Sequence, residues 1–336
     1  MAKVGVIGAG SWGTALAILL YENGHETTMW SIDPTEIEII ETKREHPLKL
    51  PGVKIPREIK ITGKLPEAIQ GMDFLVLAVP SPYVRGTARL MAPFVTEKQI
   101  IVDVAKGIED DTLMTLTEQI KEEIPQADVA VLSGPSHAEE VAKNLPTICV
   151  IGAKVKETAE YLQEMFMNSV FRVYTSPDMI GIELGGSLKN VIALAAGIAD
   201  GLGYGDNTKA ALITRGIAEI SRLGIKMGGQ PETFSGLSGM GDLIVTCASV
   251  HSRNRMAGYL IGQGKSMEEA MAEVKMVVEG VYSAKAALKL SKKYEESMPI
   301  VEAVNEVLFD GKDAAVAVID LMVRESRVEY EMLPWD

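Results

Sequence analysis

Two lysines lie where the sequence could support acid–base chemistry. Lys106 follows the short apolar run 100–104, and the C-terminal end of a parallel strand faces the ligand crevice of an α/β sheet. Lys189 lies in a segment made otherwise of small and apolar residues. Burial lowers the pKa of a lysine and a second cation lowers it further, so Lys189 is a candidate base near neutral pH. The alternatives are an ordinary surface lysine at 106 and a lysine at 189 whose ammonium extends to the surface.

A loop after the next apolar run offers polar groups to a substrate. The run 129–132 is followed by Ser133, Gly134 and Ser136. Their hydroxyls and backbone amides could enclose a polar ligand beside Lys106. An ordinary turn is the alternative.

Further polar residues occur on glycine-rich or helix-starting segments. Asp242 lies in the segment 239–243, and Ser252 can cap a helix that begins with Arg253 and Asn254. A guanidinium, an amide and the N–H groups of a helix start together suit a phosphate. The alternative is a basic residue exposed in a first helical turn.

A glycine turn at the start of the chain predicts a nicotinamide dinucleotide site. Gly8, Gly10 and Gly13 directly follow the apolar run 3–7 and open the predicted helix 11–23. In this context the first glycine permits a tight turn, the second lets the backbone approach the pyrophosphate, and the third lets helix and strand pack closely. The helix N-terminus then faces the phosphates. A turn that only packs is the alternative.

The choice between NAD and NADP depends on the end of the second predicted strand. Asp33 lies twenty residues beyond Gly13, where an acid can accept a hydrogen bond from the adenosine ribose 2′-hydroxyl and disfavour a 2′-phosphate. This favours NAD. Asp33 also precedes Pro34 and could simply cap the next helix, while Lys43 and Arg44 are close enough in sequence to reach a phosphate.

These residues are distributed over two predicted domains. Strand-like runs separated by helix-length segments predict a parallel, doubly wound sheet of the Rossmann type in the first half. The runs are 3–7, 27–30, 74–79, 100–104, 129–132, 147–151 and 171–174. We expect a dinucleotide-binding domain over residues 1–180 and an all-α substrate-binding domain over 181–336, with a cleft between them.

Helix signals dominate the second half. Ser176, Pro177 and an early acid predict a helix start, with Ser176 as its cap. Ser266 has the spacing of a capping box, Pro299 can open another helix, and Asp313 can cap the apolar series 316, 319 and 323.

Composition excludes several classes of protein. The 336 residues carry 33 basic and 46 acidic side chains, a net charge of −13, which disfavours nucleic acid and acidic membranes as partners. Two cysteines without CxxC spacing predict no disulfide framework and fit a reducing cytoplasm. The N-terminus lacks a secretory signal, and the apolar stretch 191–202 is too short to span a membrane.

Metal and hydrolase chemistry find no support in the sequence. The four histidines show no metal-ligand spacing, and His137 and His251 are assigned no catalytic role. No Ser-His-acid, HExxH or CxxC pattern occurs. We therefore expect no metal site.

Taken together, the motifs resemble the bacterial NAD(P)-dependent glycerol-3-phosphate dehydrogenase family along essentially the whole chain. The matching segments are 8–15, 106–109, 133–139, 185–190, 200–205, 241–243, 252–254 and 277–280. The resemblance implies interconversion of sn-glycerol 3-phosphate and dihydroxyacetone phosphate, supplying glycerol 3-phosphate for phospholipid synthesis.

The resemblance also implies roles for individual residues. Lys189 matches the proton acceptor of the family, with Lys106 beside it. The implied substrate contacts are Lys106, Gly134, Ser136, Lys189, Asp242, Ser252, Arg253 and Asn254. The implied cofactor contacts, added to Gly8, Gly10, Gly13 and Asp33, are Ser11, Trp12, Lys106, Ala138, Arg253, Val277 and Glu279. Many members carry a basic residue at the place of Ile32, and Asp33 also occurs in members that use NADPH.

Two other functions remain open at this point. A related two-domain β-hydroxyacid dehydrogenase would bind a carboxylate instead of a phosphate. A non-catalytic dinucleotide sensor would lack a base or a phosphate anchor, whereas Lys189 and Arg253 are both present. The sequence does not define the oligomeric state, and a homodimer is kept as a hypothesis.

Overall fold

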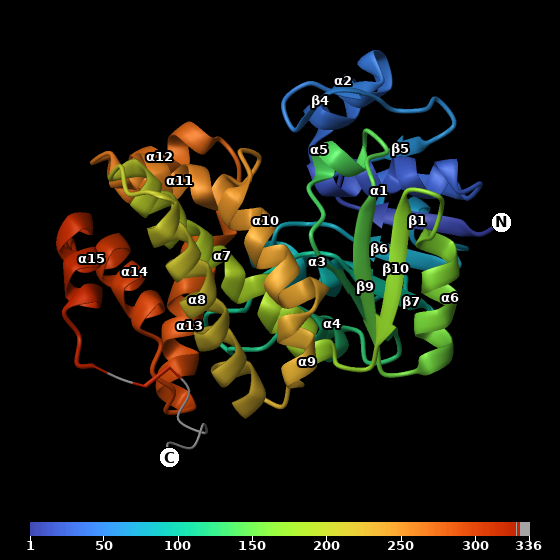
Figure 1. The fold of residues 1–336 in the computed structure, drawn as a ribbon. Helices are drawn as coiled ribbons and strands as arrows, with labels where there is room; N and C mark the ends of the chain where they lie inside the picture. Colours follow the sequence, from blue (N-terminus) through green and yellow to red (C-terminus); the bar gives the residue numbers. More distant parts are fainter. Residues whose placement is uncertain (327, 330–336) are drawn as a thin grey trace.

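The computed structural model describes residues 1–326 and 328–329. Its N-terminal part is built on one eight-stranded sheet with the order β10-β9-β8-β7-β6-β1-β2-β5 (Figure 1). The strands are β1 (Lys3–Ile7), β2 (Glu26–Trp30), β5 (Lys60–Thr62), β6 (Phe74–Leu77), β7 (Ile100–Asp103), β8 (Asp128–Ser133), β9 (Thr147–Ala153) and β10 (Phe171–Ser176). The predicted doubly wound fold is confirmed.

Helices cover both faces of this sheet because its central strands bury apolar residues on both sides, most completely in β6. In β6, Phe74 and Val76 belong to the core formed with α1 (Ser11–Glu22) and α6 (Lys156–Phe166). Leu75 and Leu77 point the other way, into the core formed with α3 (Val84–Met91) and α4 (Leu116–Glu123). Burial on both faces is typical of parallel sheets.

The expectation of parallel pairing is wrong at one place, because β8 and β9 are antiparallel. The connection between them holds only the four-residue helix α5 (Ala138–Val141). Four helical residues rise about 6 Å, whereas a six-residue strand spans about 20 Å. The chain therefore does not return along β8, and the connection remains at the carboxyl edge of the sheet.

A small hairpin above the sheet was not predicted. It consists of β3 (Glu45–His46) and β4 (Leu50–Lys54), and it follows helix α2 (Pro34–Lys43) near the top of Figure 1. β3 and β4 are too short or too polar to show a clear apolar period. The same is true of β5, which pairs with β2 at the sheet edge. Short one-turn helices, η1 (Leu65–Ala68) and η2 (Ser81–Tyr83), complete the N-terminal part.

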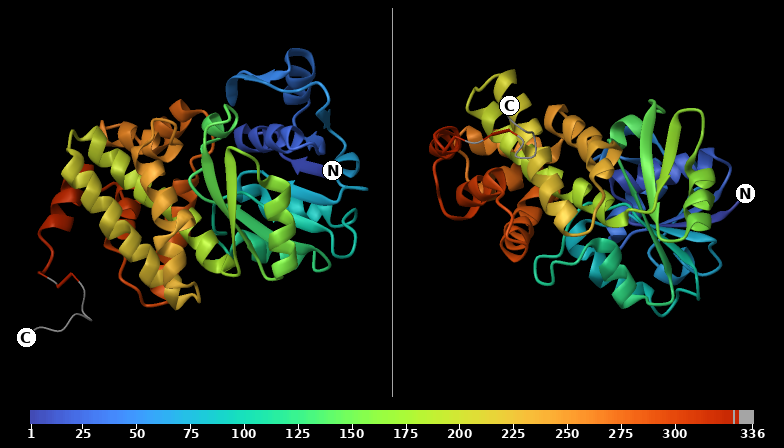
Figure 2. Two further views of the ribbon diagram at one scale, coloured as in Figure 1. Left: turned by 45° about the vertical axis from the view of Figure 1, so that its right-hand side comes forward. Right: turned by 60° about the horizontal axis from the view of Figure 1, so that its bottom comes forward.

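The second part is helical, as expected (Figure 2). Its elements are α7 (Met179–Gly201), α8 (Asp206–Lys226), α9 (Pro231–Ser235), η3 (Leu237–Gly241), α10 (Asp242–Ala248), α11 (Arg253–Gly262), α12 (Met267–Val274), α13 (Glu279–Lys293), α14 (Pro299–Phe309) and α15 (Ala314–Met322). α7 packs against α8, α10, α11, α13 and α14. A Cβ at Gly197 would lie 2.0 Å from the carbonyl oxygen of Arg255, so the small residues of α7 let α11 cross it closely.

α7 is also longer than the apolar stretch noted in the sequence. Among the described residues it is the one helix with the length and apolarity of a membrane span, and 94% of that apolar window is buried inside the protein. This is the pattern of a core helix.

The prediction that Ser176 caps α7 is wrong. β10 pairs with β9 through Ser176, so the helix begins only after Pro177. Asp178 is its cap and accepts a hydrogen bond from the Gly181 N–H at 2.9 Å. The predicted capping box at Ser266 is confirmed.

Two further helix starts agree with the sequence. Pro299 opens α14, and the Asp313 carboxylate accepts hydrogen bonds from the first turn of α15. The apolar series of α15 does not face the core of this chain, since Val316, Ile319 and Val323 are 46%, 55% and 73% exposed.

Candidate active site

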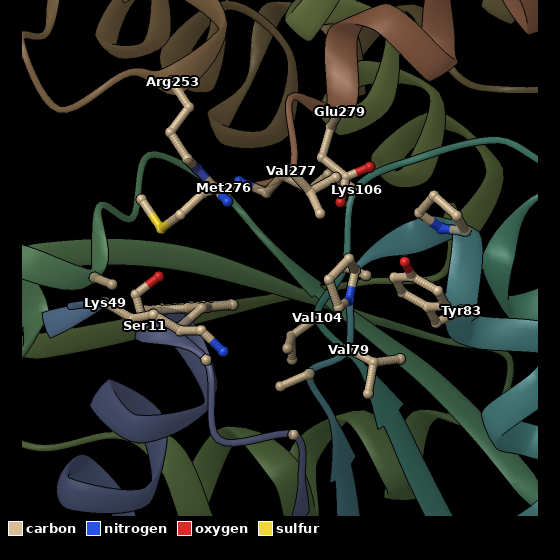
Figure 3. Close-up of a pocket in the computed structure, with 18 of the residues that line it drawn as sticks. Ser11, Lys49, Val79, Tyr83, Val104, Lys106, Arg253, Met276, Val277 and Glu279 are labelled. Carbon is tan, nitrogen blue, oxygen red and sulfur yellow. The ribbon is translucent and has the colours of Figure 1, made fainter. Parts of the chain in front are cut away.

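A cleft of about 1270 Å³ lies between the carboxyl ends of the strands and the helical part (Figure 3). One wall comes from the turns after β1, β2, β6, β7 and β8. The other comes from α7, α10, the start of α11 and the segment before α13. Ligands of open α/β sheets bind at this edge, so the cleft is the candidate active site.

The glycine turn has the geometry that a dinucleotide requires. Gly8 has a φ of +117°, and a Cβ there would lie 2.7 Å from the carbonyl oxygen of Ala78. A Cβ at Gly13 would lie 2.0 Å from the carbonyl oxygen of Gly8, so α1 packs directly on the turn. Gly10 faces open space on the cleft wall, with Ser11 and Trp12 next to it. A pyrophosphate can thus approach the backbone at the start of α1.

The two predicted lysines meet at one carboxylate. Lys189 Nζ donates to Asp242 Oδ1 at 2.7 Å, and Lys106 Nζ donates to Asp242 Oδ2 at 2.5 Å. Lys189 also donates to Thr246 Oγ1 at 2.5 Å. The side chains of Lys189 and Asp242 are 6% and 2% exposed. Strand β7, helix α7 and helix α10 thus bring together three groups that are far apart in the sequence.

The surroundings shift the acidity of this group of side chains. The pKa of Lys189 is lowered to about 8, because burial and the Lys106 ammonium together lower it more than Asp242 raises it. Burial alone would raise the pKa of Asp242, but Lys106 and Lys189 hold it below its usual value. Lys189 can therefore exchange a proton near neutral pH while Asp242 stays ionised.

The loop after β8 contributes to the same place. Gly134 is buried, and its carbonyl oxygen accepts hydrogen bonds from Lys106 Nζ and Ser136 Oγ, both at 3.0 Å. Ser136 and Ala138 line the cleft. The loop therefore holds Lys106 in position and leaves Ser136 beside it.

The predicted phosphate site lies at the start of α11. Ser252 caps the helix by accepting from the Arg255 N–H at 3.2 Å, and Arg253 extends along the cleft in Figure 3. Asn254 donates to Asn190 Oδ1 at 2.9 Å and accepts from the Gly280 N–H at 2.8 Å. These two hydrogen bonds therefore hold the Asn254 amide in place next to Arg253.

Val277 and Glu279 line the cleft from the helical side, and Glu279 lies above Lys106 in Figure 3. The Glu279 carboxylate accepts from the backbone N–H of Ser81 at 3.1 Å and from its hydroxyl. Burial raises the pKa of Glu279. This contact joins the two parts of the molecule at the cleft.

Asp33, predicted to meet the ribose, is exposed and serves the start of a helix. Its carboxylate caps α2 by accepting from the Thr35 N–H at 2.9 Å, and it does not line the cleft. Arg44, considered for a phosphate, instead donates to the carbonyl oxygens of Pro56 and Ile59.

Sequence reasoning missed several residues of the cleft. Asn190 directly follows the predicted Lys189, and Thr246 lies one helical turn after the predicted Asp242. Their positions relative to these predicted residues were the signal that could have identified them. Glu36 and Lys49 also line the cleft, but only the folded hairpin brings them together.

The histidines and cysteines form no ligand cluster. The rings of His137 and His251 lie 6.0 Å apart on the cleft wall, and burial together with Lys189 and Lys106 lowers the pKa of His137. Cys149 and Cys247 are free and buried. Over residues 1–326 and 328–329, no group of three or more His, Cys, Asp or Glu side chains is arranged to hold a metal ion.

A glycine-turn nucleotide fold facing two lysines that share a buried carboxylate defines a two-domain, nicotinamide-dependent dehydrogenase. Comparisons identify the family. The N-terminal model of NAD-dependent glycerol-3-phosphate dehydrogenase matches residues 3–159, and the C-terminal model matches residues 178–319. The chain belongs to this family, as its motifs predicted, and it is an oxidoreductase that uses NAD or NADP.

Individual relatives agree along the full length. The chain is 64% identical over 335 residues to the glycerol-3-phosphate dehydrogenase (NAD(P)+) of Agathobacter rectalis, covering 100% of both chains. It is 60% identical over 333 residues to that of Fusobacterium nucleatum, covering 98% of this chain and 99% of the relative. The crystal structure of the glycerol-3-phosphate dehydrogenase from Coxiella burnetii matches with a TM-score of 0.93 at 36% identity, over 96% of this chain and 99% of that one. These matches favour the phosphate substrate over the two alternative functions.

Proposed function

We propose that this enzyme interconverts sn-glycerol 3-phosphate and dihydroxyacetone phosphate, with Lys189 as the proton acceptor and donor. The observation that carries this assignment is the buried Lys189 ammonium on the cleft wall, held by Asp242 at 2.7 Å. Lys106, which shares the same carboxylate, is the second catalytic residue.

The proposed reaction oxidises a secondary alcohol. The C–H bond breaks with its electron pair, the hydroxyl proton leaves, and a C=O bond forms. The bound nicotinamide supplies the hydride acceptor, or the donor in the reverse direction. Lys189 in its neutral form takes the hydroxyl proton. Lys106 donates a hydrogen bond to the reacting oxygen as negative charge develops there.

The phosphate of the substrate is assigned to the start of α11. Arg253 supplies a charged, bidentate donor, Asn254 an amide, and Ser252 the capped helix start. Gly134 and Ser136 complete the substrate contacts with Asp242. In a chain with a net charge of −13, this local group of cations is what would attract an anionic substrate.

The dinucleotide is assigned to the opposite wall and to residues that reach across the cleft. Its pyrophosphate would lie on the glycine turn. The assigned residues are Gly8, Gly10, Ser11, Trp12, Gly13, Lys106, Ala138, Arg253, Val277 and Glu279.

We further propose a division into a dinucleotide-binding domain, residues 1–180, and a substrate-binding domain, residues 181–336, of which 327 and 330–336 lie outside the described residues. Two buried, free cysteines support a cytoplasmic location, and supply of glycerol 3-phosphate for phospholipid synthesis follows from the family.

The exposed apolar residues of α15 support a homodimer. A monomer mass in light scattering at micromolar concentration would exclude it.

A substrate panel at fixed NADH tests the proposed activity. Removing the phosphate forfeits charge-assisted hydrogen bonds, so we expect kcat/KM for dihydroxyacetone phosphate to exceed that for dihydroxyacetone by roughly 10²-fold or more. Comparable turnover of an unphosphorylated keto acid would instead identify a hydroxyacid dehydrogenase.

A further inference from the structure

Two acids follow strand β2, and the structure gives them different tasks. Asp33 is exposed and caps α2. Glu36, one turn later, lies on the cleft wall with Ser31 and Ile32. In this fold an acid about twenty residues beyond the glycine turn meets the adenosine ribose. Of the two acids, Glu36, in the first turn of α2, is the one that lines the cleft.

Glu36 is held by three partners that the hairpin and the strand end provide. The Ser31 hydroxyl donates to one carboxylate oxygen, while His46 Nε2 at 2.7 Å and Lys49 Nζ at 2.5 Å contact the other. Its side chain is 7% exposed, and His46 is 4% exposed. Burial alone would raise the pKa of Glu36, but hydrogen bonds from these partners lower it to about 2. The carboxylate is therefore ionised and fixed in place.

Lys49 is the cation of this group that a cofactor can reach. Its side chain is 41% exposed and points into the cleft near Ser11 (Figure 3). The other charged side chains of the hairpin are engaged elsewhere, because Lys54 pairs with Glu45 and Arg44 binds backbone carbonyls. The positive charge of Lys49, which could otherwise bind a 2′-phosphate, is thus already paired with the Glu36 carboxylate.

We propose that Glu36 selects NAD over NADP. Its carboxylate accepts a hydrogen bond from the 2′-hydroxyl of the adenosine ribose, and its ion pair withholds the Lys49 ammonium from a 2′-phosphate. The inference rests on the proposed function, since it requires the pyrophosphate to lie on the glycine turn. The expected preference for NAD is therefore unchanged, but the proposal attributes it to Glu36 instead of Asp33.

The test is a direct binding titration of NADH and NADPH, followed by the fluorescence of Trp12 and Trp30, which line the cleft. The measured quantity is the ratio of the NADPH Kd to the NADH Kd. We expect NADH to bind more tightly to the unmodified protein. Glu36→Gln should lower the ratio at least about tenfold, since one charge-assisted interaction is lost to NADH and Lys49 becomes available to NADPH.

Two variants serve as controls. Asp33→Asn removes the neighbouring acid and should leave the ratio within about twofold, because its carboxylate serves the helix start. Lys49→Gln should move the ratio at least about threefold in the direction opposite to Glu36→Gln, because the negative charge of Glu36 then repels a 2′-phosphate without the compensating Lys49 ammonium. Because Lys49→Gln keeps Glu36, its binding ratio tests the role of the Glu36 carboxylate even if Glu36→Gln does not fold.

An unchanged ratio in Glu36→Gln, or a shift in Asp33→Asn as large as that expected for Glu36→Gln, would overturn the proposal. So would tighter binding of NADPH by the unmodified protein. Failure of the proposed function gives a different result, namely no turnover of dihydroxyacetone phosphate with either cofactor while the binding ratio still responds to Glu36.

Discussion

At the scale of single residues, the chemistry depends on one carboxylate shared by two ammonium groups. Asp242 compensates only one of the two charges on Lys106 and Lys189, so the protonated trio carries a net charge of +1 in a buried place. Burial, together with the second positive charge of Lys106, is the physical reason for the lowered pKa of Lys189, since loss of its proton makes the trio neutral.

The pH dependence of the reaction should report this lysine. With the pKa of Lys189 at about 8, kcat/KM for glycerol 3-phosphate oxidation should rise as the pH passes through this value, because the neutral form is needed. Reduction of dihydroxyacetone phosphate should fall over the same range. Because Asp242 raises this pKa, Asp242→Asn should shift both midpoints to lower pH in steady-state profiles. Profiles that stay flat from about pH 6.5 to 9.5 would disprove the assignment.

Arg253 should act mainly on substrate affinity. Arg253→Ala removes a charge-assisted donor to the phosphate, so we expect KM for dihydroxyacetone phosphate to rise about 10- to 100-fold. Arg253→Lys keeps the charge but not the bidentate geometry and should recover only part of the loss. Equal KM values in all three proteins, measured at saturating NADH, would remove Arg253 from the phosphate site.

At the scale of elements, α7 positions both lysines. It carries Lys189 itself, and two residues earlier Ser187 donates to the carbonyl oxygen of Gly107 at 3.0 Å, next to Lys106. Glu183 accepts hydrogen bonds from the backbone and hydroxyl of Thr117 at the start of α4. One helix of the second part is thus tied at successive turns to the sheet part, which sets the distance between the catalytic groups.

A buried carboxyl between two helices should make stability depend on pH. Glu219 of α8 accepts from the Ile300 N–H at the start of α14, and burial raises its pKa to about 7 from the ordinary value of 4.5 for a glutamate. Between these two pH values the folded state holds a proton that the unfolded state has lost, so this group's contribution to stability decreases as the pH rises. Glu219→Gln should therefore gain a few degrees of Tm relative to the parent on going from pH 5 to pH 8. A constant difference across this range, by scanning calorimetry, would show that the carboxyl does not titrate there.

Local patterns predicted elements better than they predicted pairings. Apolar runs identified the central strands because these strands are buried on both faces, and capping residues identified helix starts such as Ser266 and Asp313. The direction of β9 depended on what the connection after β8 could span. The difference between Asp33 and Glu36 arises from a hairpin contact, which has no local signature. The meeting of two lysines in the cleft was foreshadowed by the sequence, because Lys106 follows the end of a strand and a charge such as Lys189 within a small, apolar segment is unusual.

At the scale of the whole molecule, the active site exists only where the two parts meet. Sheet ends provide the dinucleotide turn and Lys106, while helices provide Lys189 and the phosphate site. The Glu279 contact with Ser81 crosses this junction. A ligand that touches both walls should therefore stabilise the molecule as a unit.

Cofactor binding should raise the unfolding temperature of the full chain. At a free NADH concentration of 100 times its Kd, mass action adds about 2.7 kcal/mol to the free energy of unfolding. Differential scanning calorimetry should show a higher Tm for the full transition. A shift confined to one of two separate transitions would mean that the cofactor binds one part alone.

The central claim is that Lys189 transfers the proton, and the kcat of Lys189→Ala for dihydroxyacetone phosphate reduction tests it most directly. Loss of a positioned acid–base group should lower kcat by about 10²- to 10⁴-fold, with the Kd for NADH changed less than about twofold. Lys226→Ala, at an exposed lysine of α8, is the matched control and should retain full activity. A Lys189→Ala enzyme within about tenfold of the parent kcat would contradict the account.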